Sequence, residues 1–123
     1  MIKNLLLVAL GGALGSALRY LANVNIGKIW PFKLYYATFL VNIIGCLLIG
    51  LFIGYLQKNE SANEPLKLIL ITGFCGGFTT FSTFGSENFN LLQSQNYITS
   101  LLYIAASIII GIAFVGVGIY LSK

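Results

Sequence analysis

Residues 34–57 read LYYATFLVNIIGCLLIGLFIGYLQ, an uncharged and almost wholly apolar run between Lys33 and Lys58. A helix needs roughly 20 mostly apolar residues to cross the hydrocarbon core of a bilayer. The apolar residues are continuous rather than alternating, and a strand of a membrane barrel needs only about 10 residues, so the run favours a helix. We therefore expect residues 34–57 to form a transmembrane helix.

Three further uncharged runs lie on either side of this one. The first separates Lys3 from Arg19, the second separates Lys67 from Glu87, and the third extends from Glu87 to Lys123. Only 8% of the chain is charged, whereas soluble domains carry about 25% charged residues. The pattern predicts an all-α integral membrane protein with four transmembrane helices in a single domain. The expected spans are residues 4–21, 34–57, 66–90 and 98–121.

The distribution of Lys and Arg between the two sides of the membrane is nearly even. Four of these residues fall on one side and three on the other, with the acids Glu60 and Glu64 on the first side. A clear Lys/Arg excess normally sets the orientation of a membrane protein. We therefore predict insertion in both orientations and antiparallel pairing of two copies; the alternative is that one extra lysine suffices to orient the chain. The first group is Lys3, Lys58, Lys67 and Lys123, and the second is Arg19, Lys28 and Lys33. Because these lysines flank helices, the net charge of +4 requires no nucleic-acid partner.

Two pairs of glycines have the G-x-x-x-G spacing that lets helices approach closely. They are Gly11 with Gly15 and Gly50 with Gly54. The contacts could be within the chain or between copies, and the spacing does not choose. A lone four-helix bundle fills its core with side chains and leaves no evident path for a solute. We therefore expect so short a chain to form a solute pathway by oligomerisation.

The third span contains the unusual string GFCGGFTTFSTFG at residues 73–85. Glycine destabilises a helix by about 1 kcal/mol relative to alanine, so Gly76 and Gly77 predict a break near the middle of this helix. A break at membrane depth frees backbone carbonyls, which then need a partner. A cation, water or another subunit could supply one. The alternative is an unbroken, glycine-rich packing face.

Polar residues also occur at helical spacing in two other spans. Thr38 and Asn42 share one helix face, and Tyr103 and Ser107 share another. An amide in hydrocarbon is costly unless it is paired, so Asn42 should face protein or water. Hydroxyl and amide donors, together with the positive edges of phenylalanine rings, favour a path for a small anion.

Several protein classes fit the sequence poorly. A proton-coupled drug antiporter of four helices would carry an intramembrane acid in its first span, and residues 4–18 contain none. An accessory subunit without transport activity would not need a hydroxyl-rich break. The chain contains no histidine and no apparent nucleophile-base pair, which argues against an enzyme.

The sequence resembles the Fluc/CrcB family of fluoride channels over its whole length. The most specific element is the string GGFTTFSTF at residues 76–84, in the third of four spans. The likeness extends to GGALGSALRY at residues 11–20, to VNIIG at residues 41–45, and to Tyr103 and Ser107. The glycine pairs alone would be a weak signal.

This resemblance implies an antiparallel, dual-topology homodimer with two pores in the bacterial plasma (inner) membrane. Such a channel passively exports cytoplasmic fluoride and so protects the cell; its partners are fluoride, its own second copy and membrane lipid. The resemblance also implies a structural Na⁺ at the dimer centre, held by the backbone carbonyls of Gly76 and Thr79 from both subunits. The implied pathway residues are Phe81, Phe84, Asn42, Thr38, Tyr103 and Ser107.

Three other positions have implied roles near the pathway. Arg19 matches a vestibule arginine that draws anions towards the pore. Glu87 follows the motif by one turn, and its role stays open. Gly111 stands where many relatives are expected to carry a hydroxyl. The sequence therefore does not show which residue would continue the row of polar groups beyond Ser107.

Overall fold

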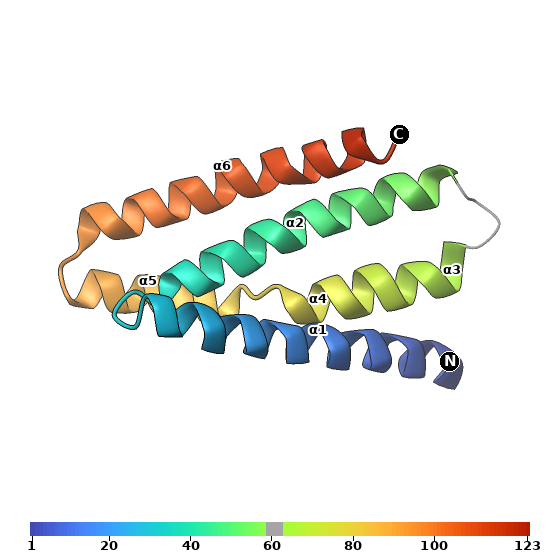
Figure 1. The fold of residues 1–123 in the computed structure, drawn as a ribbon, viewed down its shortest axis with the longest axis horizontal. Helices are drawn as coiled ribbons and strands as arrows, with labels where there is room; N and C mark the ends of the chain where they lie inside the picture. Colours follow the sequence, from blue (N-terminus) through green and yellow to red (C-terminus); the bar gives the residue numbers. More distant parts are fainter. Residues whose placement is uncertain (59–62) are drawn as a thin grey trace.

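The computed structural model describes residues 1–58 and 63–123, and the part of the chain that it describes is helical (Figure 1). Four helices are long and apolar enough to cross a membrane within these residues, one of them the interrupted span Glu64–Gln93. The prediction of an all-α, four-span membrane protein is confirmed. The elements are α1 (Ile2–Ile29), α2 (Tyr35–Lys58), α3 (Asn63–Leu66), the π-helical η2 (Lys67–Cys75), α4 (Gly76–Phe78), α5 (Ser82–Gln93) and α6 (Tyr97–Leu121).

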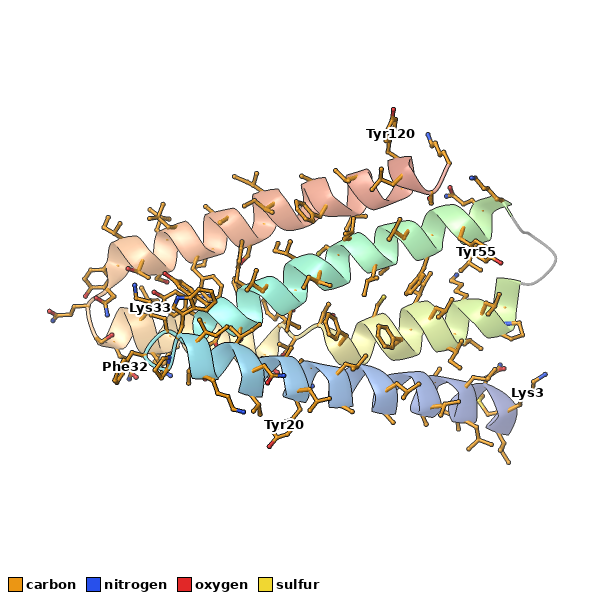
Figure 2. The ribbon with its side chains drawn as sticks, viewed as in Figure 1. Lys3, Tyr20, Phe32, Lys33, Tyr55 and Tyr120 are labelled. Atoms are coloured by element: carbon orange, nitrogen blue, oxygen red, sulfur yellow. The ribbon has the colours of Figure 1, made fainter. Side chains whose placement is uncertain are left out.

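Both termini lie at the same end of the bundle, as an even number of crossings requires (Figure 1). Lys3 and Lys33 lie at opposite ends (Figure 2), as the expected topology places them. Glu60, which is expected on the same side as Lys3, lies outside the described residues.

The first helix is longer than the sequence predicted, since it ends at Ile29 rather than near residue 21. The fall in hydrophobicity after residue 21 predicted the end of the span. A helix can, however, continue with polar residues outside the hydrocarbon core of the bilayer. The helix ends where proline requires it. Trp30 precedes Pro31 and has φ −126° and ψ 74°, because the proline ring disfavours the α conformation of the preceding residue.

The bundle consists of two closely packed helix pairs. α6 packs mainly along α2, and α1 packs along η2 and α4 (Figure 1). Gly11 and Gly15 bring α1 against the backbone of η2 at Ile69 and Phe74. The pair Gly50 and Gly54 does the same for α2 against α6, at residues 115–122. Both G-x-x-x-G pairs therefore serve packing within the chain, which was one of the two readings of their spacing.

The interruption of the third span, predicted at Gly76 to Thr79, begins at the last residue of that stretch. Gly76 and Gly77 are helical, and the irregular segment is residues 79–81, beginning at Thr79 with φ −90° and ψ 161°. Gly77 has a packing reason instead: a Cβ at this position would lie 2.6 Å from the carbonyl oxygen of Gly12. Glycine weakens a helix, but here the close approach of α1 requires it and the helix continues through it.

Adjacent glycines of α1 provide a matched test of this packing. Gly11→Ala should destabilise the protein by roughly 1–3 kcal/mol, the usual cost of overpacking, because its Cβ would collide with the carbonyl oxygen of Ile69. Gly12→Ala should change stability by less than about 1 kcal/mol, and towards a more stable helix, because its nearest neighbour would be 3.7 Å away. Thermal unfolding in detergent measures both; equal melting temperatures for the two variants would contradict this packing.

Candidate functional site

An open cavity of about 490 Å³ lies where α2 and α6 face η2, α4 and the irregular segment. Four predicted pathway residues line it, Asn42, Phe81, Phe84 and Ser107, and so do Gly76 and Thr79, the predicted cation ligands. The rest of the lining is mainly small or apolar. Gly45, Cys46, Ile49, Ile71, Thr72, Cys75, Thr80 and Ile108 complete it.

The side-chain amide of Asn42 is bonded to the backbone of the irregular segment. Its Nδ2 donates to the carbonyl oxygen of Thr80 at 2.9 Å, and its Oδ1 accepts from the N–H of Thr80 at 2.8 Å. These two hydrogen bonds, to the peptide groups on either side of the Thr80 Cα, hold Thr80 in a fixed orientation beside α2. Asn42 therefore positions the backbone as well as lining the cavity, and it keeps one amide hydrogen for another acceptor.

These bonds change the partners of two backbone carbonyls. In a continuous α-helix the N–H of Thr80 would bond to the carbonyl of Gly76, and that of Thr83 to the carbonyl of Thr79. Here the first donates to Asn42 and the second donates at 3.2 Å to the hydroxyl of Thr80. The carbonyls of Gly76 and Thr79 are thus released from the helical pattern at the edge of the cavity.

The two phenylalanines of the motif stand at the start of α5. Their ring centroids are 5.7 Å apart, and Phe81 is 81% exposed while Phe84 is partly buried. The ring of Phe84 also meets Tyr103 edge to face, at 4.9 Å between centroids and an interplanar angle of 67°. The Tyr103 contact thus restrains the Phe84 ring, whereas Phe81 is held from one side only.

Thr38 and Tyr103 do not line the cavity, because both hydroxyls are bonded to Glu87. Thr38 donates to its Oε2 and Tyr103 to its Oε1, each at 2.8 Å. The carboxylate thereby joins α2, α5 and α6 one turn beyond Phe84. Sequence reasoning left Glu87 without a role; the available signal was an acid at the end of an apolar span, with hydroxyls on two other spans to receive it.

Ser107 and Gly111 lie along one face of α6, with different surroundings. The Ser107 hydroxyl is buried at the cavity and has no hydrogen-bond partner among the described residues. Gly111 is buried against α2, where a Cβ would lie 3.4 Å from the sulfur of Cys46. At position 111 this chain therefore has a small residue packed against Cys46, where relatives are expected to carry a polar group.

Arg19 lies on the α1 side of the interruption and is partly buried. Its Nε donates to the carbonyl oxygen of Gly77 at 3.0 Å. A cation is favourable at the C-terminal end of a helix, where carbonyls lack helical partners. Arg19 therefore stabilises the end of α4, a contact that the sequence did not predict, and its role in drawing anions stays a prediction.

The family model described as "CrcB-like protein, Camphor Resistance (CrcB)" matches residues 6–119. The chain belongs to the CrcB family. It is 49% identical to a protein of Flavobacterium psychrophilum over 98% of each chain. It is 45% identical to one of Azobacteroides pseudotrichonymphae, over 100% of this chain and 98% of the relative. A protein of Chloroflexus aurantiacus is 42% identical over 98% of this chain and 96% of the relative. All three are named "Fluoride-specific ion channel FluC".

The resemblance inferred from the motifs is thus confirmed. The names of the CrcB relatives describe a channel, in agreement with the expectation that the chain is not an enzyme. Within this CrcB chain, the structure gathers Asn42, Phe81, Phe84 and Ser107 at one cavity. Thr38 and Tyr103 lie outside the cavity lining and are hydrogen-bonded to Glu87. Arg19, on α1, is hydrogen-bonded to Gly77.

The hydrogen bonds of Asn42 in this CrcB chain predict that Asn42→Asp, although nearly isosteric, lowers the stability of the protein. Asn42→Asp turns a donor into an acceptor that faces the carbonyl of Thr80, and it adds a negative charge at the cavity. The loss of the bond and the repulsion should destabilise the interrupted segment by about 1–3 kcal/mol, the usual range for a buried group left unpaired. Thermal unfolding is the measurement, with Asn90→Asp at an exposed position of α5 as control. Equal melting temperatures for the two variants would contradict the role of Asn42.

Proposed function

We propose that this chain is a fluoride-specific ion channel. The observation that carries the proposal is the cavity at the interrupted span, which combines uncharged donors with phenylalanine rings in a member of the CrcB family. Relatives that match nearly the whole chain carry the name of a fluoride channel. The channel would conduct passively and export cytoplasmic fluoride across the inner membrane of a bacterium, which would protect the cell from this toxic ion.

The donors at the cavity suit an ion that holds its water tightly. A pore must replace water hydrogen bonds as the ion enters, yet release the ion again. Asn42 retains one N–H, and the Ser107 hydroxyl has no partner in the described chain. Neither group carries a full charge, so each can replace a water molecule without trapping the anion.

The interruption itself favours an anion over a cation on the α5 side. α5 begins at Ser82, directly after Phe81, so its first amides lie at the break. The N-terminus of a helix carries a partial positive charge, about +0.5 of an elementary charge. The positive edges of Phe81 and Phe84 lie at the same place. Glu87 is kept from the cavity lining by two hydroxyl donors, which limits its repulsion of an anion.

Fluoride efflux from liposomes containing only the purified protein tests the function. Wild-type protein should release fluoride and not chloride. Phe84→Ile keeps apolar bulk but removes the ring edge, and it should lower fluoride efflux by at least about tenfold, equivalent to 1.4 kcal/mol on the barrier. Phe89→Ile, at an exposed position of α5 outside the cavity, is the matched control. Equal chloride and fluoride efflux, or undiminished efflux by Phe84→Ile, would overturn the assignment.

A homodimer would complete the site. Phe81 is 81% exposed, and the cavity beside it opens to the outside of the single chain. Thr72 and Gly76 lie one turn apart on the exposed side of the same span, and no neighbour within 4 Å would meet a Cβ on Gly85. Lipid tails cannot form a hydrogen bond with a hydroxyl. Small residues such as glycine favour contact with another helix. A second copy covers this surface, and the nearly even charge count favours antiparallel pairing.

Dual topology predicts that reporters fused after Lys123 appear on both sides of the membrane. The physical reason is the count of four Lys/Arg residues against three, which leaves insertion almost unbiased. Three lysines added to one end should give a single orientation, and this variant should restore fluoride resistance only with an oppositely biased partner. A single orientation for the unmodified protein would refute dual topology.

A structural Na⁺ at the dimer centre would satisfy the carbonyls of Gly76 and Thr79. Both have lost their helical N–H partners to Asn42 and Thr80, and hard cations prefer oxygen ligands. When bound, the ion would supply positive charge where these carbonyls converge from two copies. The dimer should therefore melt at a lower temperature when Na⁺ is replaced by N-methylglucamine at equal ionic strength. An unchanged melting temperature would count against the cation.

A further inference from the structure

Asn88 and Ser100 form a buried polar pair outside the cavity. They are only 6% and 1% exposed, and neither lines the proposed pathway. The hydroxyl of Ser100 donates to Oδ1 of Asn88 at 2.9 Å, and Nδ2 of Asn88 donates to the carbonyl oxygen of Phe84 at 2.9 Å. A continuous hydrogen-bonded chain thus runs from α6, through α5, to the backbone of Phe84.

The pair lies beside the other polar link between α5 and α6, the hydrogen bond from Tyr103 to Glu87. Asn88 is the one buried residue of α5, all of whose residues are described. The helix begins after an irregular segment, and its side chains at Phe89 and Leu92 are exposed. Apolar packing is non-directional, so the rotation and height of α5 on α6 depend on the two hydrogen bonds, Tyr103 to Glu87 and Ser100 to Asn88. A buried hydrogen bond requires a fixed rotation and height.

The register set by this pair reaches the ring of Phe84. Phe84 lies one helical turn before Asn88, so both are on the same face of α5. Tyr103 lies three residues after Ser100, so both are on the face of α6 that meets it. The rings of Phe84 and Tyr103 meet edge to face at 4.9 Å. A slip of one residue along a helix is a rise of about 1.5 Å, which would break the Asn88–Ser100 bond and separate the rings.

We propose that Asn88 and Ser100 are positioning residues for fluoride conduction: their buried hydrogen bond, together with the bond between Glu87 and Tyr103, sets the register of α5 on α6 and thereby holds the Phe84 ring edge towards the pathway. The proposal rests on the proposed function and deepens it. Neither residue touches the ion. Their effect is on the geometry that Phe84 and Tyr103 present to it, and thus on flux and on discrimination against chloride.

A pair of variants distinguishes positioning from a purely structural role. Ser100→Ala leaves the Oδ1 of Asn88 buried without its donor, which costs both stability and register. The double variant Asn88→Leu with Ser100→Ala replaces both partners by apolar groups, an exchange that can be nearly neutral for stability. The double variant keeps the packing between α5 and α6 but lacks the hydrogen bond between Ser100 and Asn88 that helps to fix their relative position. Ser100→Thr keeps the hydroxyl and should keep the bond, and Ser94→Ala removes a hydroxyl at an exposed position at the end of α5 as a control.

Fluoride and chloride efflux from liposomes, counted per active liposome, and melting temperature are measured for each protein. Wild-type, Ser94→Ala and Ser100→Thr proteins should conduct fluoride alike. The double variant should melt near wild type but conduct fluoride at least about tenfold more slowly, equivalent to 1.4 kcal/mol on the barrier, with a smaller fluoride-to-chloride ratio. Ser100→Ala should show the same loss of flux with a lower melting temperature, and the double variant keeps the test decisive if Ser100→Ala does not fold.

Two results would overturn the proposal, and they differ. If the wild type conducts fluoride and the double variant does so equally well and equally selectively, the pair is structural and positioning is wrong. If the wild type and Ser94→Ala release no fluoride at all, the proposed function itself is wrong and the inference falls with it.

Discussion

The two hydrogen bonds between the Asn42 side chain and the backbone of Thr80 are the interaction on which the rest of the site depends. In hydrocarbon an unpaired peptide group costs several kcal/mol, so a helix can be interrupted there only if other groups take over its backbone bonds. Asn42 bonds both the N–H and the carbonyl oxygen of Thr80, which belong to two successive peptide groups. The hydroxyl of Thr80 then takes the N–H of Thr83 and begins α5. The interruption, the new helix N-terminus and the released carbonyls follow from this arrangement.

A second layer of polar contacts keeps α5 in place after the interruption. Glu87 binds hydroxyls from α2 and α6, and Asn88 binds Ser100 of α6. Such bonds are directional, and a low-dielectric surrounding makes an unmade bond costly. The layer therefore specifies one position for a helix whose other side chains are largely exposed. In the same bundle the glycines act differently: they permit the close contact of α1 with η2 that holds the other half of the interrupted span.

Much of the architecture could be predicted because hydrophobic length is a local property. The spacing of charges indicated four spans, and the spacing of glycines indicated close helix contacts. The details that failed depended on a helix-end signal in the sequence or on contacts between helices. α1 continues to Ile29 because Pro31, rather than the fall in hydropathy, ends it. Position 77 requires glycine because α1 packs against it, and the helix is interrupted beyond it, where Asn42 bonds the backbone of Thr80.

For the site, residue type and motif identified the groups at the cavity, and Asn42, Phe81, Phe84 and Ser107 do lie together. The sequence by itself determined that the chain spans a membrane, that its third span is unusual, and that amide, hydroxyl and aromatic groups supply its polar chemistry. These follow from composition and from spacing along one helix. Only the tertiary structure decided which donor meets which acceptor: Thr38 and Tyr103 meet at Glu87, Arg19 meets Gly77, and Ser100 meets Asn88. Hydrogen bonds between helices depend on rotation and height of one helix against another, and no spacing within a single helix encodes these.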